Sequence, residues 1–161
     1  MLTENEIKTL PYRLGVIAFI LDSENKLLII KNKGYKENEW TNPGGGVEEG
    51  ETFEVAVLRE LKEELGCDCF KIEAVSKNDL KYDFSLEHIN ERYKYRGVYQ
   101  RGQIKKQFLV RFTGEKESIK LNISENTDYK WININDINKY FIFPNQAENA
   151  FKFLKEFNFI K

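Results

Sequence analysis

The sequence predicts an α+β fold in which a mixed β-sheet lies between helical layers. Segments rich in β-branched and aromatic residues recur along the chain, and at least two uninterrupted segments have the apolar spacing of amphipathic helices. The strand and helix segments do not alternate in a regular βαβ pattern, which favours a mixed sheet over a parallel one. Because a chain of 161 residues buries one core and a second full domain is not expected at this length, residues 1–161 are interpreted as one domain.

The first elements are predicted to be strands. Residues 13–21 are rich in β-branched and aromatic side chains, four polar residues follow, and residues 27–30 are all apolar, which together predict a β-hairpin. The polar residues 33–39 predict a loop. Residues 43–46 are one proline and three glycines, so the backbone there is expected to adopt positive φ angles or to approach another group closely.

Residues 52–65 predict a helix, because no glycine or proline interrupts them and Gly66 provides a C-terminal stop. At about 100° per residue, apolar side chains fall on one side of this helix and glutamates on the other. The side expected to pack holds Val55, Leu58, Leu61 and Leu65, and the acidic side holds Glu60, Glu63 and Glu64.

The downstream part of the chain predicts further strands and one more helix. Residues 108–112 are the stronger strand candidate, and the others are residues 72–75, 80–86 and 129–134. Residues 146–157 have apolar side chains at helical spacing, so a C-terminal amphipathic helix is expected to cover one face of the sheet.

Composition excludes several classes of function. Lys and Arg total 25 against 26 Asp and Glu, so no overall charge indicates a nucleic-acid or membrane partner. The acidic N-terminus does not resemble a signal peptide and no segment has transmembrane length, so a cytoplasmic protein without membrane contact is expected. Cys67 and Cys69 are interpreted as reduced thiols. Because His88 is the single histidine, catalysis is expected to depend on carboxylates.

The three glutamates of the predicted helix are the main candidate site. Like charges within about one helical turn repel one another, and a hard divalent cation such as magnesium offsets that repulsion. A solvated acidic helix face is the alternative interpretation. The glycine-rich segment that leads into the helix permits close approach to a metal or phosphate, and Arg59 can orient a neighbouring carboxylate. The glycine-rich loop, the three glutamates and Arg59 are therefore interpreted as one site.

The same residues resemble a known motif. Five residues separate Gly45 from Glu51, and seven more separate Glu51 from the segment 59–67 (RELKEELGC). This pattern resembles the Nudix box. Only Cys67 differs, because the family usually has an aliphatic residue at that position. The motif fixes many glycine and charged positions, so it is highly specific. The resemblance implies a Nudix-type α/β/α sandwich and a hydrolase that uses Mg²⁺, with Mn²⁺ as an alternative.

The resemblance also implies roles for the residues of the box. Glu60, Glu63 and Glu64 resemble the metal ligands, together with the carbonyl group of Gly45. Glu51 and Arg59 resemble the pair that holds the loop against the helix. The implied reaction is attack of a metal-activated water on phosphorus, completed by a glutamate base that the family does not fix at one position. Glu63 and Glu64 are candidates for that base.

The flanking residues are similar to the branch of the family that contains RNA 5′-pyrophosphohydrolases and diadenosine tetraphosphate hydrolases. The similar segments are Tyr12-Arg13, residues 40–43, residues 102–109 and Trp131. In that branch a glutamate six positions before the late tryptophan joins the metals or acts as base, which corresponds to Glu125; the alternative is an ordinary exposed loop acid. The candidate substrate-binding residues are Arg13, Trp40, Gln103, Lys106 and Phe143.

Two further features concern the substrate. The segment 92–96 (RYKYR), with cations following it, interleaves cations with aromatic residues and is interpreted either as a grip for a polyphosphate and a base or as a solvated strand face. The branch usually has basic residues after the phenylalanine that precedes the last helix, whereas Pro144 and Asn145 follow Phe143 here. This difference weighs against an RNA substrate.

Three hypotheses for function follow. The first is hydrolysis of a pyrophosphate linkage in a dinucleoside polyphosphate or in 5′-triphosphorylated RNA. The second is a nucleotide-pool hydrolase that converts a nucleoside triphosphate to the monophosphate and pyrophosphate. The third is a nucleotide-binding or RNA-binding module without turnover, which is disfavoured because every acid of the box is present. The expected partner is a nucleotide or an RNA 5′ end, and no oligomeric state is predicted.

Overall fold

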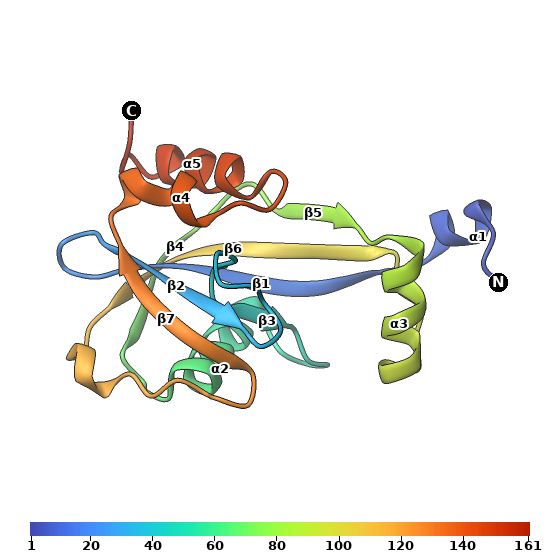
Figure 1. Cartoon of the computed structure of the whole chain (residues 1–161), viewed down its shortest axis with the longest axis horizontal. Coiled ribbons are helices and arrows are strands. Elements are labelled where there is room, and N and C mark those ends of the chain that lie inside the picture. Colours follow the sequence, from blue (N-terminus) through green and yellow to red (C-terminus); the bar gives the residue numbers. More distant parts are fainter.

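The computed structural model describes all residues, 1–161, as a twisted sheet with helices on both faces and at one end (Figure 1). Its elements in chain order are α1 (Glu4–Thr9), β1 (Tyr12–Leu21), β2 (Leu27–Asn32), β3 (Gly44–Gly46), α2 (Phe53–Leu65), β4 (Phe70–Val75), β5 (Leu80–Asp83), α3 (Leu86–Arg96), β6 (Gly102–Phe112), η1 (Lys116–Ser118), β7 (Asn126–Ile132), η2 (Ile134–Asp136), α4 (Ile137–Tyr140) and α5 (Gln146–Glu156).

The sheet is mixed, as the sequence predicts. Its main path runs β4-β6-β1-β2-β7, with β3 paired to β1 and β5 paired to β6. The long central strands β1 and β6 are parallel, in register from Tyr12 opposite Gly102 to Leu21 opposite Arg111. The remaining pairs are antiparallel. The parallel pair requires a long connection between β1 and β6, and that connection contains the glycine segment, α2 and α3.

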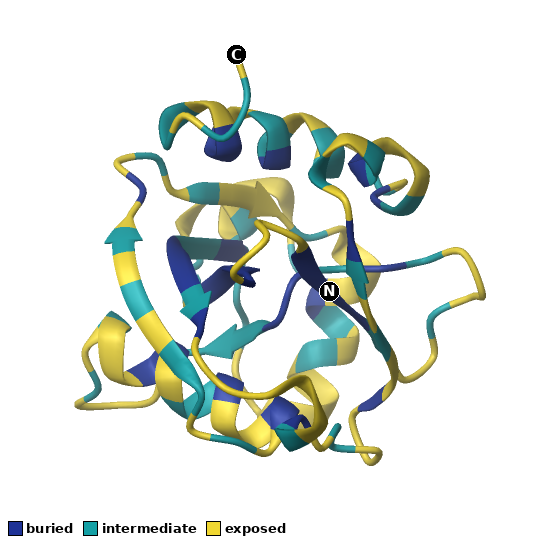
Figure 2. Ribbon diagram, turned by 90° about the vertical axis from the view of Figure 1, so that its left-hand side faces the viewer, coloured by how far each residue is buried: buried dark blue, intermediate teal, exposed yellow.

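Two hydrophobic cores lie on opposite faces of the sheet. Val16, Ala18 and Ile20 of β1 pack with α2 on one face, and Phe19 and Leu21 pack with α4 and α5 on the other. Side chains of a strand alternate between faces, so β1 contributes to both cores. Figure 2 shows the buried segments in the sheet and on the inward sides of the covering helices. The expected layered α+β sandwich is confirmed.

Both predicted helices form. Thr52 caps the start of α2, its side chain accepting a hydrogen bond from the backbone N–H of Val55 at 3.2 Å, and Gly66 ends the helix at φ 67°. Helix α5 covers one face of the sheet, where Phe153 stacks on Phe19 with ring centroids 3.9 Å apart. The predicted hairpin of β1 and β2 also forms. None of the helices is long and apolar enough to cross a membrane.

The packed face predicted for α2 is wrong in part. The side chains of Val55 and Leu58 are 55% and 40% exposed, whereas Glu64 is only 7% exposed. The helix packs through Val57 and Leu61, and at 100° per residue Glu64 lies about 20° from Val57 around the helix axis. The acidic side and the packed side therefore overlap at Glu64.

The strand predicted over residues 80–86 is too long, and a helix follows it. Strand β5 ends at Asp83, and α3 begins after Ser85, whose side chain accepts a hydrogen bond from the backbone N–H of His88 at 3.2 Å. Gly97 ends α3 at φ 72°. The interpretation of residues 92–96 as a strand face is therefore wrong, although a serine cap and a glycine stop both stand in the sequence.

Candidate active site

The three glycines of β3 allow the backbone to lie against α2 and β1. A Cβ atom at Gly45 would lie 2.2 Å from the carboxyl carbon of Glu60, and one at Gly46 would lie 2.3 Å from a guanidinium nitrogen of Arg13. A side chain at either position would displace a charged group from the site. Close approach, and not a positive φ angle, therefore explains why glycines stand in this segment.

Arg59 holds the loop after β3 against α2. Its Nε and Nη2 atoms donate to the two carboxylate oxygens of Glu51 at 2.6 and 2.8 Å, and Nη2 also donates to the carbonyl oxygen of Gly46 at 2.8 Å. Hydrogen bonds from Arg59 lower the pKa of Glu51 to about 2, so this carboxylate stays charged. The geometry agrees with the role that the motif implies for the Glu51–Arg59 pair.

Arg59 also contacts two of the candidate metal ligands. Its Nη1 atom lies 3.0 Å from an oxygen of Glu60 and 3.3 Å from an oxygen of Glu63. Burial raises the pKa of Glu60, and the charges of Glu63 and Glu125 add to that rise. The carboxylates therefore lie near enough to repel one another, and Arg59 offsets part of the repulsion.

Glu64 is the most buried acid of the site. Its carboxylate accepts a hydrogen bond from the backbone N–H of Gly44 at 3.1 Å. Burial raises its pKa to about 8, and the neighbouring charge of Glu60 contributes. A carboxylate in this position is costly to ionise unless a positive charge lies close to it.

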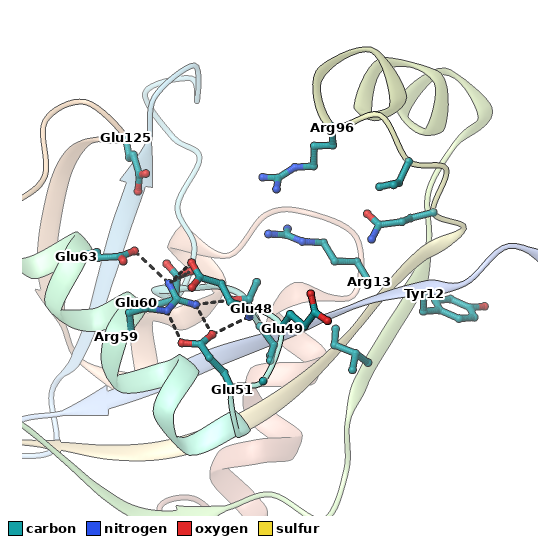
Figure 3. Close-up of a pocket in the computed structure, with 16 residues that line it drawn as sticks. Tyr12, Arg13, Glu48, Glu49, Glu51, Arg59, Glu60, Glu63, Arg96 and Glu125 are labelled. Carbon is teal, nitrogen blue, oxygen red and sulfur yellow. Dashed lines mark hydrogen bonds and ion pairs between the residues drawn. The ribbon is translucent and has the colours of Figure 1, made fainter.

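Glu125 reaches the site from the loop before β7. The residue is exposed, and its carbonyl oxygen accepts a hydrogen bond from the backbone N–H of Lys33 at 2.8 Å, which fixes the loop at the end of β2. The structure thus brings Glu125 to the same cavity as Glu60 and Glu63 (Figure 3).

The acids face two arginines across a cavity of about 730 Å³. Arg13 of β1 and Arg96 of α3 direct their guanidinium groups toward the carboxylates (Figure 3). Burial lowers the pKa of Arg13, and the charges of Arg96 and Arg92 lower it further, so the arginines lie close to one another. We call this the acidic cavity, defined by Glu60, Glu63, Glu125, Arg13 and Arg96. Its carboxylates form one wall, which is negative, and its arginines form the other, which is positive.

The donor set of the acidic cavity fits a divalent cation. Its carboxylates and backbone carbonyl groups are the hard oxygen ligands that such ions prefer. A bound cation would also offset the cost of ionising Glu64 and the repulsion around Glu60. No three of these acids converge on one point in the structure, since Arg59 holds Glu60 and Glu63. The candidate ligands are Glu60 and Glu63, which line the cavity, and Glu64 and the carbonyl group of Gly45, which do not.

A second cavity, of about 700 Å³, has a different lining. Aromatic side chains from three separate segments surround it, and the rings of Tyr35 and Phe143 meet edge to face with centroids 5.3 Å apart. Lys105 also lines this cavity, and burial lowers its pKa to about 8. We call it the aromatic cavity, defined by Tyr35, Tyr82, Phe84, Phe143 and Lys105.

Helix α3 connects the two cavities. Ser85 and His88, at its beginning, line the aromatic cavity, and Arg96, at its end, lines the acidic cavity. Sequence reasoning missed this arrangement and the contributions of Tyr35 and Tyr82. Their aromatic rings within otherwise polar segments were the available signal.

The predicted substrate-binding residues lie in different places. Arg13 lines the acidic cavity and Phe143 the aromatic cavity. Gln103 is buried and accepts a hydrogen bond from the hydroxyl group of Tyr82 at 2.5 Å, so it supports the aromatic cavity from behind. Trp40 is 5% exposed and belongs to the core under α4 and α5. Lys106 lies 3.6 Å from Asp79, and neither Trp40 nor Lys106 lines a cavity described here.

Comparison with known proteins agrees with this geometry. The family model described as NUDIX domain matches residues 11–157. A curated protein of Rickettsia canadensis (strain McKiel) named RNA pyrophosphohydrolase is 38% identical over 130 residues, which cover 80% of this chain and 79% of the relative. A protein of the same name from Orientia tsutsugamushi (strain Boryong) is 34% identical over the same shares of the two chains.

Solved structures show the same fold at lower identity. The E. coli dihydroneopterin triphosphate pyrophosphohydrolase superposes with a TM-score of 0.69 at 20% identity, over 91% of this chain and 99% of that one. The C. elegans Ap4A hydrolase, in a binary complex, superposes with a TM-score of 0.64 at 18% identity over the same shares. The extent of the family match and the identity to the curated relatives show that the chain belongs to the NUDIX family and is a Nudix hydrolase.

Proposed function

We propose that this enzyme uses magnesium to hydrolyse a pyrophosphate linkage in the 5′-triphosphate of RNA. The observation that carries the proposal is the acidic cavity, where carboxylates face the guanidinium groups of Arg13 and Arg96 (Figure 3). Carboxylates suit a divalent cation and arginines suit phosphate oxygens, so the cavity suits a polyphosphate that carries a metal ion. The curated relatives named RNA pyrophosphohydrolase support RNA as the substrate.

The residues of α2 would hold the metal. Glu60, Glu63 and Glu64, with the carbonyl group of Gly45, are proposed as its ligands, and Mn²⁺ is expected to replace Mg²⁺. Bound magnesium supplies positive charge that attracts phosphate oxygens and makes water more acidic. Arg59 keeps the ligands aligned with the loop, because it donates to Glu51, Gly46 and two of the glutamates.

The remaining groups would position the substrate and remove a proton. Arg13 and Arg96 neutralise phosphate oxygens from the wall opposite the acids. Water attacks a phosphorus atom, the bond from that phosphorus to the bridging oxygen breaks, and the leaving phosphate takes the bonding electrons. A glutamate carboxylate accepts the proton of the attacking water. Glu125 is proposed for that task, because it is exposed and lies on the rim of the cavity.

A dinucleoside polyphosphate is the second candidate substrate. The observation that favours it is the segment after Phe143, where Pro144 and Asn145 line the aromatic cavity and supply no cation for an RNA backbone. One nucleoside of such a substrate could stack in the aromatic cavity while its phosphates occupy the acidic cavity.

A product assay separates these candidates. The protein is incubated with magnesium and, in parallel, 5′-triphosphorylated RNA, a dinucleoside tetraphosphate, a nucleoside triphosphate and ADP-ribose. The expected result is conversion of the RNA to its 5′-monophosphate with the highest kcat/KM of the panel. Faster turnover of the dinucleotide would favour the second candidate, and faster turnover of the nucleoside triphosphate would identify a nucleotide-pool enzyme. Cleavage of none of the four would overturn the proposal.

A further inference from the structure

The last turn of α3 and the segment after it form an exposed surface of tyrosines and cations. Tyr95 is 89% exposed and Tyr93 is 42% exposed. The ring of Tyr93 stacks on that of Tyr99, with centroids 4.0 Å apart and planes 5° apart, so the pair forms a two-ring stack that holds Tyr93 against the segment after the helix. We call this the tyrosine–cation surface, defined by Tyr93, Lys94, Tyr95, Arg96 and Tyr99.

The charge of α3 is divided along its length. Glu87 lies in its first turn and Glu91 at its middle, whereas Lys94 and Arg96 lie in the last turn. Neither of these two cations has an ion-pair partner, unlike the nearby Arg101, which binds Asp83 at 3.0 Å. Arg92 is half-buried over the ring of Phe84 and donates a hydrogen bond to Gln100 at 3.3 Å, and its buried Nε atom has no hydrogen-bond partner. The end of α3 is therefore a local positive region on a chain whose net charge is −1.

The tyrosine–cation surface is continuous with the acidic cavity. Arg96 belongs to both, and Val98 and Gln100 from the segment after the helix also line the cavity. In Figure 1, α3 stands at the end of the sheet where β1 begins, beyond the covering helices α2 and α5. A chain that leaves the cavity past Arg96 would meet Lys94 and the exposed tyrosine rings next.

We propose that the tyrosine–cation surface binds the single-stranded RNA that follows the 5′-terminal nucleotide. This inference rests on the proposed function. Exposed aromatic rings stack on bases of any sequence, and lysine and arginine neutralise the backbone between them. The surface thus recognises the length of a single strand and leaves the reaction in the cavity unchanged. A mononucleotide or dinucleotide can contact Arg96, which lines the cavity, but is too short to reach Lys94 and Tyr95.

The test compares two 5′-triphosphorylated RNAs with the same first residues, a dinucleotide and a single strand about twelve nucleotides long. The variants Lys94→Glu and Tyr95→Ala alter only exposed side chains, so thermal melting should show an intact fold. Each is expected to lower kcat/KM for the long RNA about fivefold, mainly through KM, and to leave that of the dinucleotide unchanged. Tyr95→Phe should retain the wild-type value, because it keeps the ring.

Lys152→Glu on α5 is the matched control, since Lys152 is an exposed lysine on a helix that covers the opposite part of the sheet. It should change neither substrate. Salt provides a second readout: for the long RNA, Lys94→Gln should reduce the slope of log kcat/KM against log salt concentration by roughly 0.7, the value for one backbone contact on a single strand.

The outcomes separate this inference from the function on which it rests. If the wild-type enzyme cleaves neither RNA, the proposed function fails and the inference fails with it. If it cleaves both RNAs with equal kcat/KM and the α3 variants match the wild type, only the inference is overturned. A third experiment tests whether the protein co-sediments with vesicles of phosphatidylserine and phosphatidylcholine. If it does, and if Lys94→Glu abolishes this co-sedimentation but leaves kcat/KM for both RNAs unchanged, the surface binds membranes and the inference is overturned.

Discussion

The two cavities of this protein differ in how they are built and in what they can do. The acidic cavity takes most of its charged groups from one short stretch, β3 to α2, and Arg59 links them through direct hydrogen bonds. The aromatic cavity takes its rings from three separate segments that contact one another only after folding. Under the proposed function, the two cavities have different roles: the first holds the reacting phosphates and the second binds a base of the substrate.

The strongest test of this division is Glu63→Gln. The side chain of Glu63 is 50% exposed, so its loss should leave the fold intact. We expect kcat to fall at least about 100-fold, because the variant removes a candidate metal ligand and catalytic carboxylate from the cavity. Steady-state kinetics on the preferred substrate measures the change, and Glu54→Gln, an exposed acid of the same helix outside the cavity, is the control. Full activity of Glu63→Gln would contradict the metal assignment.

Glu64→Gln addresses a buried acid that lies beside Glu60 and does not itself line the acidic cavity. Because burial raises the pKa of Glu64 to about 8, the folded protein holds a proton that the unfolded chain releases near pH 4.5. In metal-free buffer, the free energy of unfolding should therefore decrease as pH rises from 4.5 to 8, by roughly 3 to 5 kcal/mol from this group. The variant has no such proton to lose, so its stability should fall less over this range.

Urea denaturation at several pH values in the presence of a chelator measures that difference. Burial lowers the pKa of Lys105 to about 8 and the charge of Glu64 raises it, so the two groups interact; the contribution of Lys105 to stability changes mainly between pH 8 and its ordinary pKa of 10.5, above the pH range of this comparison. The same Glu64→Gln variant is expected to have greatly reduced turnover. Equal pH dependence of wild type and variant would show that Glu64 ionises freely in the folded protein.

Glu125→Gln should have a smaller effect than Glu63→Gln, because Glu125 reaches the acidic cavity from an exposed loop. We expect kcat to fall about tenfold, with a change in the acidic limb of the pH–rate profile if Glu125 accepts the proton. Glu117→Gln, in η1, is a control for loss of a surface acid. A pH profile identical to that of the wild type would remove Glu125 from the role of base.

The smallest expected effect comes from the aromatic cavity. Phe143→Ala should raise KM about fivefold to tenfold and leave kcat within about twofold of the wild-type value, because under the proposed function the ring would stack on a base and would touch no reacting atom. Phe143→Tyr should behave as the wild type. A fall in kcat with unchanged KM would break the proposed division between the two cavities.

The acidic cavity could be predicted largely from the sequence, because its residues are close in the chain and constrained by local geometry. Gly45, Glu51, Arg59 and the glutamates of α2 all lie within about two dozen residues, where helical spacing and glycine chemistry are informative. The burial of Glu64 was not predictable in this way, since it depends on which side of α2 meets the sheet.

The aromatic cavity could not be assembled from the sequence. Tyr35 and Phe143 are far apart in the chain and meet because β2, β5 and the start of α5 converge. Trp40 also shows the limit of the sequence. Its position in a motif suggested a contact with substrate, but a large aromatic side chain near a strand can equally fill the core. The structure buries the side chain of Trp40. Helix α3 was not predicted because most of its side chains are polar and only Ile89 is buried, so it has no clear apolar spacing. Its two caps, Ser85 and Gly97, were nevertheless present in the sequence.

Helix α3 also has a geometric consequence for the substrate. Its N-cap and first turn line one cavity and its last residue lines the other, so its 11 residues, about 16 Å of helix, run from one cavity to the other. Lengthening or shortening α3 by one turn would move Arg96 by about 5 Å relative to Ser85 and would leave the residues of the sheet and of α2 in place. Under the proposed function, the length of this helix therefore determines where Arg96 meets the phosphates of a substrate whose base lies in the aromatic cavity.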